Sequence, residues 1–426
     1  MLRRDFLKTS AAIGAGVWLG TESSALAQSP NEKLNLAIIG VGGRGEQNLD
    51  NLTSQNIVAM CDVDEVRAAK SYAKFPKAKK FHDFRTLFDD METKIDGVVI
   101  STPDHTHFHP AFWAMERGKH VYLEKPMAHS LWECRTLTEF AAKKKVATQL
   151  GVQRHDLAGL RRAVEIIQSG TIGTIKACHS WIDSGRGMPM VSAEKLPAPA
   201  TLKWDLWLGP VSERPYRKGF APYDWRFWWE FGTGETGNWG CHILDIPFWA
   251  LGLKYPTHVK GSGPEPDADR TPKTMATQLE FPATDARPAV TLHWYQGAPA
   301  ILKELSLDGK NMNNLFIGTE GMLLCGFGGV KLLPEEKFKD FKTPKKTLPK
   351  PIGFYKEWFA ACKGGEPASC QFDYSGPMAE TVLLANIAYR IQGEFDWDAV
   401  NLKVKGSDAA QKMVHTAFRK GWEVKV

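Results

Sequence analysis

The sequence predicts an α/β protein in which a doubly wound parallel sheet is followed by an α+β domain with a mostly antiparallel, open sheet. Between residues 35 and 151, short apolar runs alternate with helical patterns, which is typical of a parallel sheet with helices on both faces. Beyond residue 156, strand-like runs follow one another with little helix between them. A chain of 426 residues is also too long for one ordinary core, so two domains are expected.

Composition and charge indicate which classes of protein fit this chain. Apolar residues make up 43% and charged residues 24% of the chain, which fits a soluble globular protein. The net charge of +6 is modest and the basic residues are scattered, so no nucleic-acid partner is expected. The seven cysteines include no C-x-x-C pair, so neither structural zinc nor a disulfide framework is supported.

Residues 1–27 have the order of an export signal. Arg3 and Arg4 open a charged stretch that resembles the twin-arginine signal, residues 9–20 form a weakly apolar run, and Ala-Leu-Ala at 25–27 matches a cleavage site. A disordered basic N-terminus would not explain this order. The apolar run is too short to span a membrane as a stable helix. We therefore expect export to the periplasm or the extracellular space, without a stable membrane span.

The predicted first domain, residues 33–155, begins with an apolar strand that runs into a glycine turn. Leu-Ala-Ile-Ile at 36–39 is the apolar run, and Gly40, Gly42 and Gly45 follow in the G-x-G-x-x-G spacing. In this pattern the glycines allow a tight turn, backbone approach to a pyrophosphate, and close packing of the next helix. The N-terminus of that helix attracts phosphate groups. The sequence therefore predicts a Rossmann domain with a dinucleotide site.

The second strand indicates which dinucleotide binds. Residues 57–61 form another apolar run that ends at Asp62, 17 residues beyond Gly45. A carboxylate at this place binds the ribose hydroxyls of NAD and repels the additional phosphate of NADP. Arg44 leaves NADP open, because a guanidinium near the ribose could bind that phosphate. NAD is the predicted cofactor, and Gly43 and Arg44 of the turn are predicted to bind it.

Further strands place polar residues at one edge of the parallel sheet. Strands are expected at 80–82, 97–101, 120–123 and 147–152, and helices at 66–72, 106–117 and 131–144. Ligands of open parallel sheets bind at the carboxyl ends of the strands. The residues of interest at that edge are Ser101, Thr102, Pro103, His107, Glu124, Lys125, Gln153, Arg154 and His155.

Several motifs occur together along the chain. Glu-Lys-Pro at 124–126 follows Gly-Lys-His-Val at 118–121 and Thr-Pro-Asp-His-Thr-His at 102–107, and further motifs stand at 170–173, 240–245 and 318–321. The combination resembles the glucose–fructose oxidoreductase/inositol dehydrogenase family, Gfo/Idh/MocA, over essentially the whole chain after residue 27. With its export signal and tryptophan-rich middle, the chain resembles the secreted branch of that family.

The resemblance implies several properties. It implies a cis peptide bond before Pro126 and a position for His107 near the nicotinamide end of the cofactor. It implies cofactor-binding roles for Ser101, Thr102, Pro103, Glu124, Lys125 and Gln153. It also implies a homo-oligomer, a dimer or tetramer, formed through the open sheet of the second domain.

The predicted second domain, residues 156–426, has fewer regular signals. A linking helix is expected at 157–168, and strands at 175–182, 274–281, 290–295, 315–317 and 322–324. Helices are expected at 354–361 and 378–391, and an exposed loop at 335–351. Residues 204–249 hold seven of the fifteen tryptophans.

Lys125 is the first catalytic candidate. A strand would hold its ammonium group at the carboxyl edge of the sheet, where it could donate to a substrate oxygen. Partial burial and the positive ring of the cofactor should lower its pKa and ease proton transfer. A surface lysine in a turn is the plain alternative, against which the flanking Glu124 and Pro126 speak.

His242 is the second catalytic candidate. Asn238, His242 and Asp245 are spaced to share one face of a helix, although Pro247 would disturb that helix. We include Asn238 and Asp245 in the predicted catalytic set. The family usually has Asp four residues before this histidine, and the pair serves proton transfer. Asn238 cannot accept a proton, so His242 acts as base alone or the chemistry is altered. A core histidine is the alternative.

Aromatic residues suggest how a sugar could bind. The run Trp-Arg-Phe-Trp-Trp at 225–229 has two interpretations of about equal weight: packing in the core, or stacking on sugar rings. Trp225 therefore joins Arg154 and His155 as a predicted substrate-binding residue.

A metal site is not predicted. His105, His107 and His109 alternate and would face one way on an extended segment. A helix from about residue 106 would scatter them, and no cysteine or carboxylate completes a ligand set.

These features predict an exported NAD(P)-dependent oxidoreductase that acts on a sugar or polyol. Hydride would pass from a carbinol carbon to the nicotinamide, while His242 takes the hydroxyl proton and Lys125 polarises the oxygen. Two alternatives stay open. One is a redox-neutral enzyme that cleaves a glycosidic bond through a transient keto intermediate. The other is a non-catalytic sugar-binding protein, which Asn238 keeps in consideration.

Overall fold

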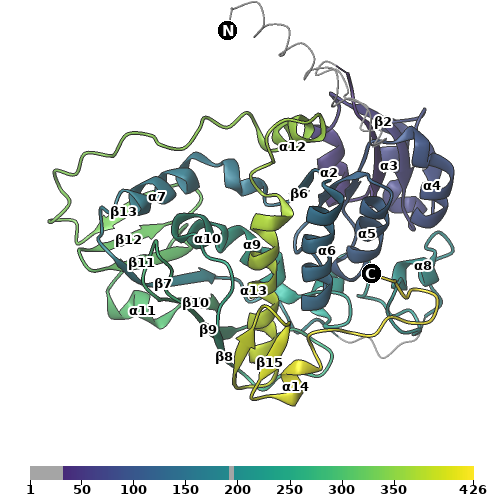
Figure 1. Ribbon diagram of the computed structural model, residues 1–426. Coiled ribbons are helices and arrows are strands. Elements are labelled where there is room, and N and C mark those ends of the chain that lie inside the picture. The colour runs from purple at the N-terminus through teal and green to yellow at the C-terminus, as the bar shows by residue number, and fades with distance from the viewer. Residues whose placement is uncertain (1–31, 191–195) are drawn as a thin grey trace, which may run out of the picture. The chain divides into compact units, whose positions relative to one another are not determined.

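Two β-sheets organise the computed structural model, which describes residues 32–190 and 196–426 (Figure 1). Residues from Lys33 onward form one unit. The predicted export signal, residues 1–27, lies outside the described residues. Among the helices that are described, none combines the length and the apolar character needed to cross a membrane.

The first sheet is parallel throughout, with six strands in the order β3-β2-β1-β4-β5-β6. Its strands are β1 (Asn35–Ile39), β2 (Asn56–Cys61), β3 (Lys79–Phe81), β4 (Gly97–Ile100), β5 (His120–Leu123) and β6 (Thr148–Leu150). The apolar runs of β1, β4 and β5 are almost fully buried, as expected for strands covered on both faces. The strand order reverses between β1 and β4, and ligands of this fold bind beside such a point.

The helices of the first domain agree with the predicted ones, except that the helix Phe84–Met91 was not predicted. They are α2 (Arg44–Asn51), α3 (Glu65–Lys74), α4 (Phe84–Met91), α5 (Phe108–Glu116) and α6 (Leu131–Lys144). Asp64 and Asp83 cap α3 and α4 by accepting backbone N–H groups, and Ser130 with Glu133 forms a capping box on α6. The helix expected at 106–117 is divided into a 3₁₀ turn, Asp104–Thr106, and α5.

The second sheet has nine strands in the order β13-β12-β11-β7-β10-β9-β8-β14-β15. Its strands are β7 (Ile175–Ile182), β8 (His258–Ser262), β9 (Met275–Phe281), β10 (Val290–Gln296), β11 (Asn314–Gly318), β12 (Met322–Cys325), β13 (Val330–Leu333), β14 (Glu394–Asp398) and β15 (Lys403–Lys405). All neighbouring strands are antiparallel except β7 and β10. The expectation of a mostly antiparallel sheet is confirmed, but β8, β13, β14 and β15 were not predicted.

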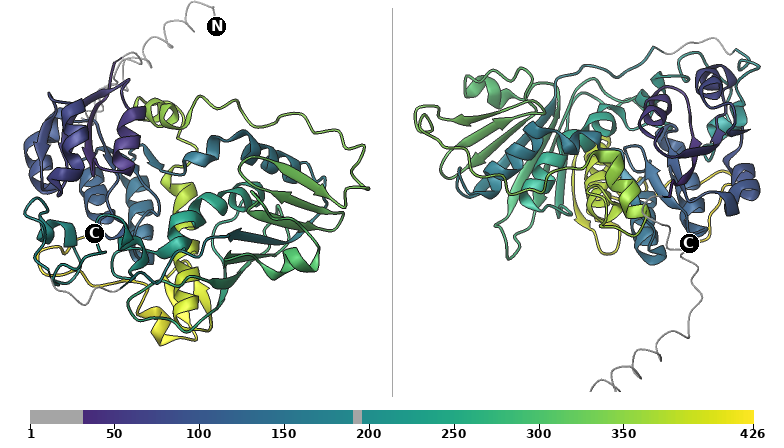
Figure 2. Two further views of the ribbon diagram at one scale, coloured as in Figure 1. Left: turned by 180° about the vertical axis from the view of Figure 1, so that it is seen from behind. Right: turned by 90° about the horizontal axis from the view of Figure 1, so that it is seen from above.

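Helices cover one face of the second sheet (Figure 2). They are α7 (Ala158–Gln168), α9 (Gly234–Ile243), α10 (Asp245–Leu251) and α13 (Phe372–Arg390). The burial pattern of β10 alternates strictly, which fits a sheet with one covered face. Four further α-helices are described: α8 (Trp204–Leu208), α11 (Ala300–Glu304), α12 (Phe354–Cys362) and α14 (Asp408–Gln411). Helix α11 places Leu302 in an apolar cluster with Trp181.

Helix α13 joins the two sheets into one core. It begins at Phe372, six residues before the expected start at Met378, and contains Pro377. Pro377 is the sixth residue of this helix and has no N–H to donate to the carbonyl oxygen of Asp373, so it removes one backbone hydrogen bond from the helix. Helix α13 packs against α6 of the first domain and against β8 of the second. The buried side chains of α13 therefore belong to one apolar core together with those of both domains.

Helices α9 and α10 correct one expectation from the sequence. Pro247 has no N–H to donate to the carbonyl of Ile243, so α9 ends at Ile243 and α10 begins at Asp245. The prediction that Asp245 shares a working face with Asn238 and His242 is wrong for this reason. Asp245 is fully buried and is bonded elsewhere.

Candidate active site

A cavity of about 920 Å³ opens at the carboxyl edge of the parallel sheet, between this edge and segments of the second domain. It is deep enough to bury a ligand larger than a single sugar. Most of the residues predicted from the sequence line it: Gly40, Gly42, Gly43, Arg44, Asp62, Ser101, Thr102, Pro103, Glu124, Lys125, Gln153, Arg154, Trp225, Asn238 and His242. The chain thus brings its predicted cofactor, catalytic and substrate residues to one cavity, and their individual roles stay predictions.

The glycine turn has the form that a pyrophosphate site needs. A Cβ atom on Gly45 would lie 1.9 Å from the carbonyl oxygen of Gly40, so only glycine allows α2 to approach the turn. Gly43 adopts a φ of 58° and precedes α2 without a side-chain cap. The N–H of Gly45 donates to the carbonyl oxygen of Gly42 at 3.1 Å, but no side chain caps this positive end of α2, which lies beside the cavity and attracts an anionic ligand. These observations fit a dinucleotide.

Asp62 follows β2 and lines the cavity. Its Oδ2 accepts the N–H groups of Val41 at 2.8 Å and Gly42 at 3.3 Å, and its Oδ1 accepts the N–H of Asp64 at 2.9 Å. Burial raises the pKa of Asp62, while these backbone donors act to lower it. The carboxylate is thus fixed to the glycine turn, at the place expected for binding ribose hydroxyls.

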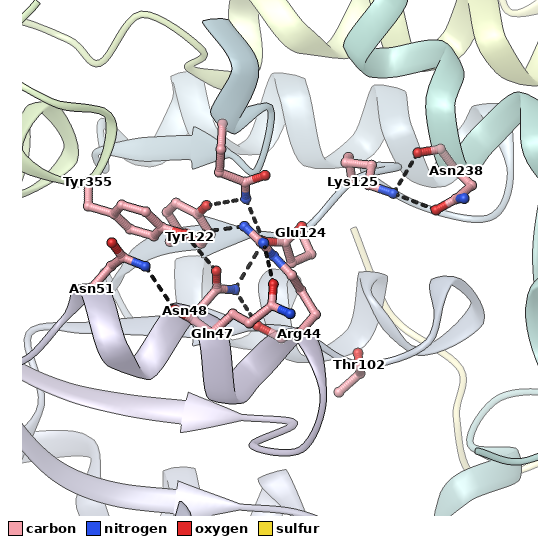
Figure 3. Close-up of polar contacts among 12 residues, drawn as sticks. Arg44, Gln47, Asn48, Asn51, Thr102, Tyr122, Glu124, Lys125, Asn238 and Tyr355 are labelled. Atoms are coloured by element: carbon pink, nitrogen blue, oxygen red, sulfur yellow. Dashed lines mark hydrogen bonds and ion pairs between the residues drawn. The ribbon is translucent and has the colours of Figure 1, made fainter. Parts of the chain in front are cut away.

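Arg44 is directed away from Asp62. Its Nε donates to Glu124 Oε1 at 3.0 Å, and its Nη2 donates to the hydroxyl of Tyr355 at 3.2 Å (Figure 3). An arginine held in this way has fewer donors for the additional phosphate of NADP. The possibility left open by the sequence, that Arg44 binds the additional phosphate of NADP, is therefore less favoured.

Glu124, which lines the cavity, accepts several hydrogen bonds. Its Oε1 receives hydrogen bonds from Arg44, from Asn48 Nδ2 at 3.0 Å and from Gln153 Nε2 at 2.7 Å (Figure 3). Tyr355 of α12 donates to Asn48 Oδ1 at 2.8 Å and stacks on Tyr122. This network joins segments that follow four different strands, so it fixes the loop that carries Lys125.

Lys125 reaches across to the second domain. The Lys125–Pro126 peptide bond is cis, as the resemblance implied. Lys125 Nζ donates to the backbone oxygen of Asn238 at 2.7 Å and to its Oδ1 at 3.0 Å (Figure 3). Burial lowers the pKa of Lys125, opposed by the charges of Glu124 and Asp104. The ammonium group is therefore held in place by neutral acceptors and loses its proton more readily than a surface lysine.

His242 projects from α9 into the same cavity. Its side chain is 8% exposed, and its Nδ1 has no hydrogen-bond partner among the described residues. Burial lowers the pKa of His242 well below its usual value, and the positive charges of Lys125 and Arg154 lower it further. The imidazole is therefore neutral near pH 7, the form that a general base requires, while its Nδ1 is enclosed by the protein.

Four predicted site residues do not line the cavity. Gly45 packs against the glycine turn, and His107 joins two loops by bonding the carbonyl oxygens of Thr102 at 2.9 Å and Pro126 at 2.7 Å. His155 and Asp245 bond each other through Nδ1 at 2.9 Å.

His155 and Asp245 belong to a buried network behind the cavity. Tyr374 donates to Asp245 Oδ1 at 2.6 Å, and the ring of His155 stacks on Trp249 at 3.9 Å between centroids. The expectation that His155 binds substrate and that Asp245 acts in catalysis is corrected by this placement. Each side chain is satisfied inside the protein, so neither reaches the cavity.

The alternating histidines are separated as expected. His105 bonds carbonyl oxygens of Trp207 and Phe231, and His109 bonds that of Trp422. The C-terminal segment thus closes over α5, and Trp422 also lines the cavity.

The sequence alone did not reveal several residues that line the cavity or lie directly behind its wall. Asp104 accepts a hydrogen bond from Thr233 at 2.7 Å, and Glu235 forms an ion pair with Arg186 beside Asn238. Arg67 and Arg226 line the cavity as well. A charged residue directly after a strand or before a glycine-rich helix is a weak signal, because its partners come from distant segments.

The fold and the cavity define an oxidoreductase of the NAD-binding Rossmann class. A model described as "Oxidoreductase family, NAD-binding Rossmann fold" matches residues 34–152. The C-terminal alpha/beta domain model of the same family matches residues 171–424. The chain therefore belongs to the Gfo/Idh/MocA oxidoreductase family, and its N-terminal domain is an NAD-binding domain.

Curated relatives match over about a third of the chain. A glycosyl hydrolase family 109 protein of Solibacter usitatus is 34% identical over 171 residues, 36% of this chain and 37% of that protein. An inositol 2-dehydrogenase of Salmonella paratyphi B is 30% identical over 152 residues, 34% of this chain and 45% of that protein. The chain thus spans less than half the length of these relatives.

Solved structures match over nearly the whole chain and show the fold. The WlbA dehydrogenase from Bordetella pertussis, in complex with NADH and UDP-GlcNAcA, has a TM-score of 0.60 at 16% identity and covers 86% of this chain and 99% of its own. An inositol dehydrogenase homolog from Azotobacter vinelandii, with NADH and myo-inositol, has a TM-score of 0.55 at 16% identity and covers 87% of this chain and 100% of its own.

Proposed function

We propose that the protein is an NAD-dependent oxidoreductase that acts on a CH–OH group of a sugar or polyol. The observation that carries the proposal is the common cavity of Lys125, His242 and the glycine turn. NAD, when bound, supplies the acceptor for the hydrogen and electron pair that leave the carbinol carbon. The inositol 2-dehydrogenase relative and the NADH complexes of similar fold support this class of substrate.

The chain's own residues divide the remaining work. Neutral His242, which lines the cavity, accepts the hydroxyl proton of the substrate at its imidazole. Lys125 donates a hydrogen bond to the same oxygen and stabilises the negative charge that develops on it. Asn238 orients Lys125 without neutralising it. Trp225 and Trp239 on the cavity wall offer flat apolar surfaces for a sugar ring.

Replacing Lys125 tests whether the cavity is catalytic. Lys125→Met should reduce turnover by on the order of a hundredfold or more, since one contact to developing charge is lost. NAD binding and the unfolding curve should change little. The matched change at exposed Lys143 should leave turnover intact. A Lys125→Met enzyme with a near-normal rate would contradict this assignment, and a wild-type protein that binds sugars without turnover would favour the sugar-binding alternative.

A redox-neutral reaction is the second candidate function. The glycosyl hydrolase family 109 relative favours it. In that case a transiently oxidised substrate loses its glycosidic bond, and the hydride then returns to the substrate. Following NADH absorbance and released aglycone on the same aryl glycoside separates the two. NADH accumulation without cleavage supports the dehydrogenase, whereas cleavage without net NADH supports the redox-neutral enzyme.

We propose further that the protein is exported by the twin-arginine route, on the evidence of residues 1–27. This route, by resemblance, carries proteins that are already folded. Free NAD is not expected outside the cytoplasmic membrane, so the cofactor must be acquired before export and then retained. Retention requires slow dissociation.

Retained cofactor gives a testable stoichiometry. Protein purified without added nucleotide should carry NAD(H) at about one per chain, because a slow off-rate outlasts dialysis. Mass spectrometry after heat release measures the nucleotide. Nucleotide-free protein that binds NAD weakly would contradict retention. It would favour a dehydrogenase that exchanges its cofactor with solution.

A further inference from the structure

The positive side chains of the cavity are only partly balanced. Arg44 pairs with Glu124, and Arg186 pairs with Glu235. The carboxylates of Asp62, Asp64 and Asp83 bond backbone N–H groups, and that of Asp104 bonds Thr233. Three arginines that line the cavity have no ion pair with any described residue: Arg67, Arg154 and Arg226.

Arg154 is the clearest of the three. It follows β6, lines the cavity, and is half-buried. Its guanidinium carbon lies 4.2 Å from the ring centre of Phe327 and 5.0 Å from that of Trp239. Its N–H groups donate to no acceptor among the described residues. Burial lowers the pKa of Arg154, and no neighbouring carboxylate opposes this. Because the side chain is only half-buried and its donors are unused inside the protein, they are available to a ligand in the cavity.

Arg154 also lies close to the proposed chemistry. Its positive charge contributes to the lowered pKa of His242, after burial and Lys125. The positive charge of Arg226 likewise contributes to the lowered pKa of Lys125. The guanidinium of Arg226 lies over the rings of Trp225 at 4.3 Å and Tyr223 at 4.6 Å. Arg226 donates to the carbonyl oxygen of Tyr223 and feels the charge of Asp104, so it is the less free of the two.

The cofactor would not balance these charges. The diphosphate of a dinucleotide takes its counter-charge from the glycine turn and the N-terminus of α2. Arg67 lies at that turn, because a Cβ atom on Gly43 would meet its Nη2 at 2.7 Å. The oxidised nicotinamide ring adds a positive charge. With the cofactor in place, the substrate end of the cavity therefore stays positive.

We propose that the substrate is an acidic carbohydrate, whose carboxylate, sulfate or phosphate group binds the guanidinium of Arg154. Stacking on Trp239 and Phe327 leaves the edges of the guanidinium plane available, and such an edge matches two oxygens of an oxyanion. The inference deepens the proposed function and rests on it for the identity of the site. It adds a charge requirement that neutral sugars and polyols do not meet.

Calorimetric titration of the full chain saturated with NAD tests the proposal. The ligands are neutral hexoses of gluco, galacto and manno configuration, each beside its hexuronate, 6-sulfate and 6-phosphate. At least one charged ligand should bind about 10- to 100-fold more tightly than its neutral parent, as a charge-assisted hydrogen bond predicts. The three charged series separate a carboxylate from a sulfate or phosphate substrate.

Variants assign the preference to Arg154. Arg154→Gln should remove it and leave weak binding of the neutral parent unchanged, and Arg154→Lys should keep only part of it. Arg161→Gln is the matched control, because this arginine also lies over a ring, Trp249 at 5.4 Å, but outside the cavity. It should bind like wild type. If Arg154→Gln does not fold, Arg154→Lys tests the same assignment, because it keeps the charge but not the planar fork of donors.

The outcomes separate this inference from the proposed function. Equal affinity for charged and neutral ligands, or no binding of any charged ligand, would overturn the inference. So would a charge preference that survives in Arg154→Gln. NADH formed from a neutral sugar would then still support the proposed function. Charge-selective binding without any turnover would instead support the inference and remove the proposed function.

Discussion

At the scale of single residues, the charge state of Lys125 depends on residue 238. Asn238 offers Lys125 two neutral oxygens, so hydrogen bonding orients the ammonium group while burial lowers its pKa. The amide of Asn238 in turn donates to Glu235 Oε2 at 3.4 Å, and Glu235 is paired with Arg186. The Glu235 carboxylate therefore contacts Asn238 and not Lys125 itself. A carboxylate at 238 would contact Lys125 directly rather than His242.

Asn238→Asp should therefore move the alkaline limb of the pH–rate profile. An adjacent negative charge stabilises the ammonium form and raises the pKa of Lys125. If protonated Lys125 is required, activity should persist to higher pH than in wild type. Profiles of kcat/KM measure this, and Asn238→Ala removes the acceptor without adding charge, so its alkaline limb should not rise. An Asn238→Asp profile that rises only on the acidic side would mean that His242, not Lys125, responds to residue 238.

Residues whose function depends on the local chain could be predicted from the sequence, and those that depend on tertiary partners could not. Lys125, Asp62 and the glycines lie directly after strands, so their place at the sheet edge follows from the strand pattern. Arg226 and Glu235 belong to the site because distant segments meet there. The roles of His155 and Asp245 were mistaken for the same reason, since their partners are each other and Tyr374.

At the scale of elements, α6 and α13 are joined by a buried ion pair. Arg135 donates from Nε to Glu380 Oε1 at 2.8 Å and from Nη2 to Oε2 at 2.9 Å. Glu380 is fully buried, and burial raises its pKa to about 7 although Arg135 opposes this. The sequence predicts both helices from their apolar periodicity, but not this contact across 245 residues. The strands β8, β13, β14 and β15 escaped prediction similarly, because they are short and partly polar and form through pairing.

Breaking the pair from one side should be costly. Arg135→Met leaves the Glu380 carboxylate buried without its partner, and we expect a loss of about 3–5 kcal/mol in the free energy of unfolding. The double variant Arg135→Met, Glu380→Leu should recover most of it, because an apolar pair of similar size needs no charge. Urea denaturation at pH 7 measures both. A single variant within about 1 kcal/mol of wild type would show that water or another side chain solvates Glu380.

At the scale of the whole molecule, buried histidines link the packing of both domains to acid stability. Burial lowers the pKa of His105 to about 3 and those of His109 and His179 to about 4. His105 contacts the aromatic cluster of Trp207 and Phe231, and His109 packs under the C-terminal segment. His179 lies on the second sheet, where it stacks on His293. Each imidazole must stay neutral for the native packing to persist.

Acid should therefore destabilise the fold well above the range in which carboxylates titrate. A histidine whose folded pKa lies below its unfolded value of 6.5 carries no penalty above that pH. As pH falls from 6.5 toward 4, the unfolded chain binds a proton that the folded chain does not, so the free energy of unfolding declines.

For His109 this loss in the free energy of unfolding at pH 5 is about 2 kcal/mol. Its Nε2 bonds the carbonyl oxygen of Trp422 at 2.8 Å, a contact that the amide of glutamine can also make. His109→Gln should therefore lose about 2 kcal/mol less than wild type between pH 7 and pH 5 in urea unfolding. Parallel losses in the two proteins would mean that His109 is protonated within the native fold, and that the C-terminal segment does not hold it neutral.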